Sequence, residues 1–139
     1  MQNIFIKDNT NTLGELSLLD YLPIDGLSIK ADMFYILYTL KLNNLKMQGT
    51  YSDKFIVIDN ILFIMELFVD KTIEGFGIMK GSSLKQIDLN NGNMKSISSL
   101  KDGYVYPKSV ENNKIIYCKK SLSSSVEHEF EQELLPISN

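Results

Sequence analysis

Several residue types on which enzymes and secreted proteins depend are scarce in this chain of 139 residues. It has no tryptophan, a single cysteine (Cys118) and a single histidine (His128). One cysteine excludes an internal disulfide, and a lone thiol favours a reducing compartment over secretion. The N-terminus also lacks the basic flank, long apolar stretch and small-residue cleavage site of a signal peptide. We therefore expect a cytoplasmic protein.

Patterns that support catalysis or metal binding are missing as well. His128 would have to serve any Ser–His–Asp triad, but the sequence offers no glycine-flanked nucleophilic serine and no orienting partner. Cys118 lies in an apolar run, where a cysteine usually packs as a small hydrophobic residue. If Glu127-His128-Glu129 is a strand, the histidine points away from the glutamates, which counts against a shared metal ion. The sequence predicts no enzyme, no metal site and no cofactor.

Neither sign of charge is in large excess. The 14 basic and 17 acidic residues give a net charge of −3 and a pI near 5.1. This balance argues against a protein whose main task is to neutralise phosphates. The lysines of the second half are dispersed and offset by acidic residues, so we do not expect nucleic acid as the main partner.

No apolar run is long enough to cross a membrane as a helix, which needs about 20 nearly uninterrupted apolar residues. The longest apolar region, Lys54–Lys71, is interrupted by Asp59-Asn60 and by Glu66. Runs of four to eight residues rich in Ile, Val and Phe, with turn-forming residues at their ends, are typical of buried strands. We expect the core of the fold to form around two such strands, Phe55–Ile58 and Ile61–Val69.

Turn-forming residues punctuate the rest of the chain at short intervals. Asn91-Gly92 supplies the positive φ angles of a tight turn and predicts a hairpin over Leu84–Ile97. Pro107 fits poorly in a central strand. The length favours a single domain over residues 1–139. The predicted fold is mainly β, an antiparallel meander of hairpins forming a sandwich or half-barrel, with at most one or two short helices.

Two segments fit a strand or a helix. The Tyr, Phe, Ile and Thr content of Met33–Leu42 favours a strand, although a helix from Ser28 also fits. Val126–Leu135 alternates strictly, so a strand places its four glutamates on one face, but its apolar residues are also spaced for a helix. In a helix the glutamates would repel one another at i, i+4, so we favour the strand. The alternative fold is α+β, with helices near residues 28–43 and 125–135.

Residues 83–120 resemble one blade of a β-propeller. In such blades a strand ending in Ile-Asp-Leu, here Ile87-Asp88-Leu89, meets a turn, and a strand ending in Ile-Ile-Tyr, here Ile115-Ile116-Tyr117, comes next. A closed propeller needs at least four blades of roughly 40 residues, and this chain holds two or three such units at most. The resemblance therefore implies meandering antiparallel hairpins, and it carries no ligand site with it.

In size, single-domain length, acidic balance and lack of a catalytic pattern, the chain resembles small bacterial toxin-immunity proteins. This resemblance of type implies a non-enzymatic protein-binding module, a toxin inhibitor that occludes its cognate toxin, with a basic nuclease domain as the expected partner. An acidic row can fill a basic cleft by charge complementarity. We expect the partner to contact Glu127, Glu129, Glu131, Glu133, Tyr104 and Tyr106.

Two other interpretations of the same residues remain open. A row of outward glutamates also protects a strand edge against aggregation, without any partner. Tyrosines such as Tyr104 and Tyr106, interleaved with lysines, are typical of platforms that stack single-stranded nucleic acid. The alternative function is therefore a small β-barrel or open-sheet domain that binds a ligand or single-stranded nucleic acid.

Overall fold

The computed structural model describes residues 3–8, 11–23, 34–43, 45–73, 76–124 and 126–134. In these ranges the chain forms strands and no helix, and so none long and apolar enough to span a membrane. The strands are β1 (Ile4–Asp8), β2 (Asn11–Pro23), β3 (Phe34–Leu42), β4 (Leu45–Ile58), β5 (Ile61–Ile73), β6 (Phe76–Asp88), β7 (Met94–Lys101), β8 (Gly103–Glu111), β9 (Lys114–Ser121) and β10 (Glu127–Glu133).

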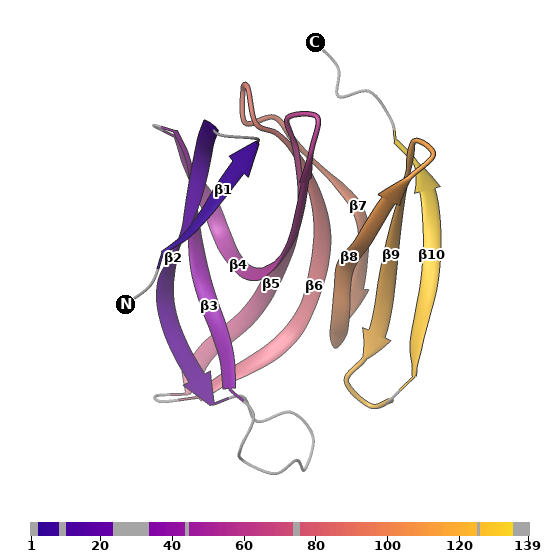
Figure 1. The fold of residues 1–139 in the computed structure, drawn as a ribbon. Coiled ribbons are helices and arrows are strands. Elements are labelled where there is room, and N and C mark those ends of the chain that lie inside the picture. Colours follow the sequence, from indigo (N-terminus) through magenta and orange to yellow (C-terminus); the bar gives the residue numbers. More distant parts are fainter. Residues whose placement is uncertain are drawn as a thin grey trace.

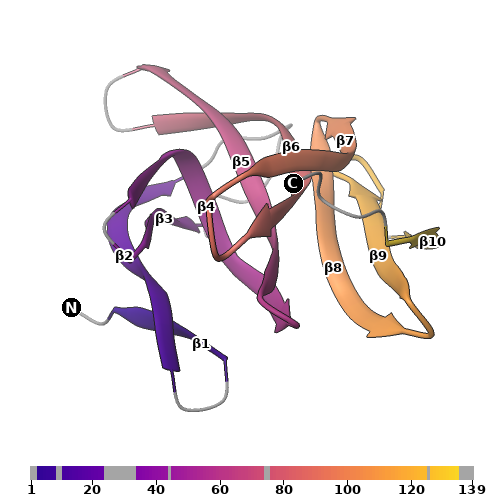
Figure 2. The same ribbon diagram turned by 90° about the horizontal axis from the view of Figure 1, so that it is seen from above.

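Two antiparallel sheets are built from these strands, so the prediction of a mainly β fold is confirmed. The seven-stranded sheet runs from β1 to β7 and the three-stranded sheet from β8 to β10, each in the order of the sequence. The larger sheet curls without closing into a barrel, because its edge strands β1 and β7 do not pair with each other (Figure 1). The smaller sheet stands beside it, with β8 nearest the larger sheet and β10 farthest away (Figure 2).

Tight turns with positive φ angles join most neighbouring strands. Asp59 and Asn60 have φ of 50° and 61°, and Asn112 and Asn113 have φ of 51° and 61°. Two consecutive residues with positive φ form the type I′ turn, whose twist matches that of the strands it joins, and Asn and Asp tolerate this conformation best after Gly. The hairpin predicted over residues 84–97 is confirmed, and Gly92 in its turn has a φ of 78°.

Both ambiguous segments are strands where the structure describes them, as the favoured interpretation predicted. β3 carries apolar side chains on both faces, since Leu37 packs in a different cluster from Leu40 and Leu42. A strand buried on both faces reads as a continuous apolar run, which explains why its periodicity did not exclude a helix. Residues 28–33, 125 and 135 of the alternative helices lie outside the described residues.

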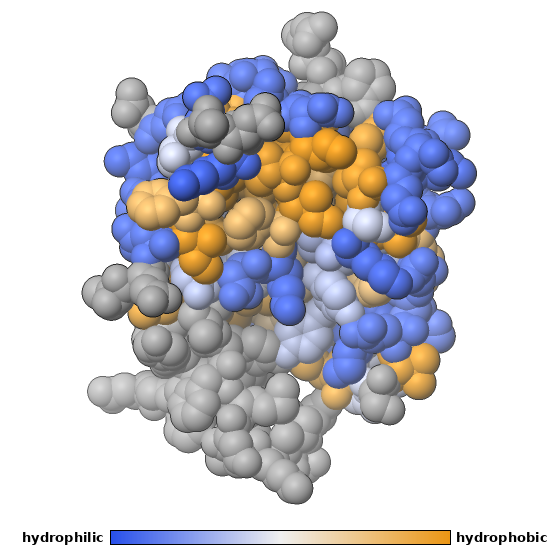
Figure 3. Space-filling model, viewed as in Figure 1, coloured by the Kyte–Doolittle hydropathy of each residue, from blue (hydrophilic) through white to orange (hydrophobic). Residues whose placement is uncertain are grey.

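The β4–β5 hairpin forms the centre of the core, as predicted. Leu62 and Ile64 point into a cluster enclosed by the curled sheet, whereas Phe63 points the other way and packs against the three-stranded sheet. The Phe55–Ile58 run is only half-buried, which differs from the predicted fully buried strand. Figure 3 shows apolar side chains gathered over this hairpin, in agreement with the partial exposure of its first strand at residues 55–58.

The two sheets meet along β8, which is an edge strand of the small sheet, so Pro107 does not lie in a central strand, where it was expected to fit poorly. The hydroxyl of Ser82, on β6, donates a hydrogen bond to the Gly103 carbonyl oxygen over 2.7 Å. The same hydroxyl oxygen accepts a hydrogen bond from the Val105 amide over 2.8 Å. Ser82 thus satisfies two backbone hydrogen-bonding groups on the inner edge of the small sheet. The opposite edge of this sheet is β10.

Candidate functional site

The six residues predicted to contact a partner share one face of the three-stranded sheet. Two rows cross this sheet from β8 through β9 to β10: Tyr104, Lys120 and Glu127 form one, and Tyr106, Cys118 and Glu129 form the other. Glu131 and Glu133 lie further along β10, opposite Ile116 and Lys114. Side chains of directly paired residues lie on the same face of a sheet.

Three of the four glutamates interact with side chains of their own sheet. Tyr106 donates its phenolic hydrogen to Glu127. The Lys108 Nζ lies 2.6 Å from a carboxylate oxygen of Glu129, and the Lys114 Nζ lies 3.3 Å from one of Glu131. The row therefore carries cations beside its carboxylates, which the sequence alone did not indicate. All four side chains of these ion pairs are exposed, and exposed pairs typically contribute only about 0–1 kcal/mol.

An open pocket of about 320 Å³ lies in the middle of this face. Its lining consists of Tyr106, Lys108, Cys118, Glu127 and Glu129. Burial, together with the hydrogen bond to Glu127, raises the pKa of the Tyr106 phenol, which stays neutral and acts as a donor. The hydrogen bond to Glu129 raises the pKa of Lys108, so its ammonium group stays charged and paired.

The opposite face of β10 is aromatic and partly exposed. The Phe130 ring stacks on Tyr117 with centroids 5.7 Å apart, and Lys119 Nζ lies 5.3 Å from the Phe130 centroid. Phe130 is 41% exposed and Val126 is 54% exposed. His128 is exposed on this strand, and Cys118 is buried, as predicted for a packed thiol.

The outer edge of β10 presents its backbone to solvent. Leu134 donates its amide hydrogen to the Asn113 carbonyl over 3.0 Å, and this pair continues the unbroken register of β9 and β10. Antiparallel pairs alternate between hydrogen-bonded and non-hydrogen-bonded, so Phe130 and Gln132 point their backbone groups at β9. The alternate residues of β10 point their backbone groups outward, namely Glu127, Glu129, Glu131 and Glu133. In the part of the chain that is described, no strand pairs with this edge.

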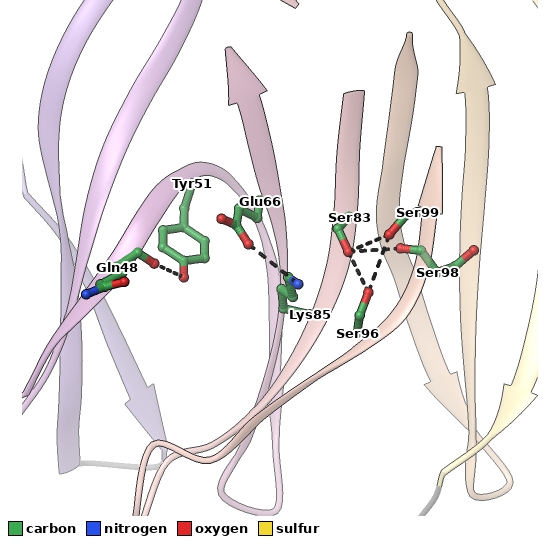
Figure 4. A network of polar contacts seen from close by, with 8 residues as sticks. All are labelled: Gln48, Tyr51, Glu66, Ser83, Lys85, Ser96, Ser98 and Ser99. Carbon is green, nitrogen blue, oxygen red and sulfur yellow. Dashed lines mark hydrogen bonds and ion pairs between the residues drawn. The ribbon is translucent and has the colours of Figure 1, made fainter. Parts of the chain in front are cut away.

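A second polar cluster, which sequence reasoning missed, lies in the large sheet (Figure 4). Lys85 Nζ lies 3.7 Å from a carboxylate oxygen of Glu66, and their side chains are only 19% and 15% exposed. Burial raises the pKa of Glu66, and Lys85 opposes this shift. Burial, followed by the charge of Glu66, raises the pKa of Tyr51, which donates a hydrogen bond to the Gln48 carbonyl. The signal for this cluster was an acidic residue inside a buried apolar strand.

Serine hydroxyls form a third polar group between β6 and β7. Ser83 is buried and lies within hydrogen-bonding distance of the hydroxyls of Ser96 and Ser99, at 2.6 and 3.0 Å (Figure 4). It also donates to the Ser98 carbonyl over 3.2 Å. These bonds satisfy a buried hydroxyl between paired strands, which accounts for the cluster structurally.

Within the described ranges, no group of three or more His, Cys, Asp or Glu side chains is placed to hold a metal ion. Comparisons of the chain with protein-family models, with curated proteins and with solved structures found no significant match. The case for a function therefore depends on the geometry of the three-stranded sheet.

Proposed function

We propose that this chain is a non-enzymatic protein-binding module, and specifically a cytoplasmic bacterial immunity protein that occludes a toxin with a basic nuclease domain. The observation that carries the proposal is the exposure of β10, whose outer edge and both faces are accessible. The resemblance in type to toxin-immunity proteins supplies the partner class, and the acidic row supports a basic surface on that partner.

The chemistry of β10 supports a protein interface. Its glutamates can pair with basic side chains, while Phe130 and Val126 offer partly exposed apolar surface on the reverse face. Protein interfaces combine apolar and aromatic anchors with charged groups at the rim. Because the ion pairs of Lys108 and Lys114 are exposed, they can exchange for pairs with a partner at little cost in free energy.

A growth assay combined with a binding assay tests this function. The product of the neighbouring gene is expressed alone and together with this chain, and the purified proteins are then mixed to measure Kd. We expect the neighbour alone to arrest growth, the wild-type chain to restore it, and the complex to be 1:1 with nanomolar affinity. The double variant Glu129→Lys/Glu131→Lys should lose both rescue and tight binding.

The matched control reverses two acidic residues of the seven-stranded sheet, Glu15→Lys/Asp53→Lys, and should retain rescue. Circular dichroism verifies that each variant is folded. A non-toxic neighbour, or a complex unaffected by the changes on β10, contradicts the proposal.

No observation on the described residues favours the alternative function of binding a ligand or single-stranded nucleic acid. The cations on the face of Tyr104 and Tyr106 lie beside carboxylates, since Lys108 pairs with Glu129 and Lys120 lies opposite Glu127. This face therefore has no excess of positive charge to attract a phosphate. A tight complex with a single-stranded oligonucleotide, weakening steeply with salt, would nevertheless replace the proposal, because that salt dependence marks phosphate contacts.

A further inference from the structure

We infer that the partner binds by adding an extended strand to the free edge of β10, and that this strand carries lysine or arginine at every second position. The inference rests on the proposed function, since it specifies how the partner of that same site would be held. It is drawn from three features of β10: its backbone, its charges and its reverse face.

The backbone of β10 is prepared for a further strand. Its outward amide and carbonyl groups belong to Glu127, Glu129, Glu131 and Glu133, and they follow one another at regular spacing without a bulge. On the inner edge of the same sheet, Ser82 bonds the backbone of β8, so only the β10 edge offers a continuous row of this kind within the small sheet. Strand addition uses such rows for affinity, and alternate side chains for specificity.

The charges select a basic strand. In an antiparallel addition, the residue that exchanges hydrogen bonds with a glutamate of β10 lies directly opposite it and on the same face. Lys120 and Lys114 already lie opposite Glu127 and Glu133 on the inner side. An incoming basic residue would place each of these carboxylates between two cations, one from β9 and one from the partner.

The same geometry counts against pairing between the β10 edges of two copies of this chain. Two β10 edges paired antiparallel would place glutamate opposite glutamate in every hydrogen-bonded pair, and like charges directly opposite are destabilising. On the reverse face, Phe130 and Val126 would lie beside the alternate residues of the added strand, which favours apolar residues there. The partner strand is therefore amphipathic, basic on one face and apolar on the other.

A set of synthetic peptides tests the binding mode with the full-length protein. The probe is the seven-residue peptide Lys-Val-Lys-Thr-Lys-Val-Lys, capped at both ends. In the first of two isomeric controls the backbone nitrogens of the last three lysines are methylated, which removes three amide hydrogens that face β10. In the second, the backbone nitrogens of the two valines and the threonine are methylated, which removes three amide hydrogens that face away. A third control replaces every lysine by glutamate.

Fluorescence anisotropy measures Kd, and amide hydrogen exchange locates the peptide. We expect the probe to slow amide exchange at Glu129 and Glu131. Methylation of the lysine backbone nitrogens should weaken binding at least about tenfold, since several backbone hydrogen bonds are lost. Methylation of the other nitrogens should change Kd much less, and the glutamate peptide should not bind. Equal binding of the two methylated isomers, or slowed exchange elsewhere only, overturns strand addition.

Variants of β10 separate this inference from the proposed function. Glu129→Pro removes an outward amide hydrogen together with the side chain, whereas Glu129→Gln removes the charge alone. We expect the proline variant to bind the toxin at least about fivefold more weakly than the glutamine variant. If charge reversal abolishes toxin binding but both of these variants bind equally, the proposed function stands and strand addition is wrong.

The converse results are equally distinct. If the lysine peptide binds at the edge but the neighbouring gene product is neither toxic nor bound, strand addition stands and the immunity function is wrong. Sedimentation of the free protein shows whether it dimerises, and amide exchange shows where the copies meet. A dimer that protects the glutamate amides of β10 would identify a second copy as the occupant and overturn the inference of a basic partner strand.

Discussion

Phe130 and Tyr117 face each other across β10 and β9 as a stacked pair of rings, with their centroids 5.7 Å apart. Tyr117 is buried against Val105 and Ile115 in the cluster between the two sheets, so it supplies a fixed platform for the outermost strand. This contact lies on the face of β10 opposite the glutamates, because successive side chains of a strand alternate between its two faces.

Removing the ring should loosen β10 more than it destabilises the whole molecule. We expect Phe130→Ala to lower the free energy of unfolding by about 1–2 kcal/mol, because a partly exposed aromatic residue loses its stacking and some apolar burial. Urea denaturation measures this loss. Phe130→Tyr keeps the ring and should be nearly neutral, whereas equal losses for both variants would contradict a role for stacking.

Amide exchange in the free protein should alternate along β10. The amides of Phe130 and Gln132 donate to β9 and should exchange slowly, while those of Glu129 and Glu131 face solvent and should exchange quickly. Residue-resolved exchange by NMR measures this pattern. Uniform protection, or the reverse alternation, would show that the edge presents other backbone groups.

Glu66 should make part of the stability depend on pH. Burial raises its pKa above the ordinary value of 4.5, so the folded state favours the protonated carboxyl. This contribution to stability is fully present below the unfolded pKa and declines as the pH rises through the folded pKa. Urea denaturation between about pH 4 and about pH 7 should therefore show wild type losing stability relative to Glu66→Gln as pH rises.

The control for this experiment is Gln48→Ala, an exposed change on β4 that removes no titratable group. Its pH profile should run parallel to that of the wild type. Parallel profiles for Glu66→Gln as well would mean that Glu66 does not titrate differently in the folded and unfolded states.

Gly49 should tolerate no side chain. Its φ of 109° lies in a region that favours glycine, and an added Cβ would contact the Glu66 carboxylate and the Tyr51 hydroxyl. We expect Gly49→Ala to destabilise the fold by roughly 1–3 kcal/mol, since both backbone strain and a displaced ion pair contribute. Thermal denaturation tests this value against Gln48→Ala, an exposed change one residue away, which should leave Tm nearly unchanged.

Local patterns allowed the strands to be predicted. Asp59-Asn60 sets its hairpin through the positive φ angles of both residues, and Gly92 supplies the positive φ angle in the loop of residues 89–93 between β6 and β7. The alternation of β10 likewise assigned its glutamates to one face. These features depend on residues that are neighbours in sequence, so they can be predicted without knowledge of the rest of the fold.

Pairings between distant residues could not be predicted in the same way. Lys85 meets Glu66 only because the register of β5 and β6 brings them together, and Lys108 reaches Glu129 across the width of the small sheet. The division of the strands into sheets of seven and three also depends on packing: Ser82 bonds the backbone of β8, and Phe63 packs against Val105. None of these partners is marked by spacing or composition.

The order of the strands has a consequence for how the chain folds. Every ladder joins strands that follow one another in sequence. Most of the hairpins therefore close over a short loop and extend the sheet already formed, although residues 24–33 separate β2 from β3. Mean sequence separation between contacting residues governs folding rates, and this arrangement keeps it low for an all-β protein. The slow step should then be the docking of the finished β8–β10 meander along β6, where the chain joins segments that are not neighbours.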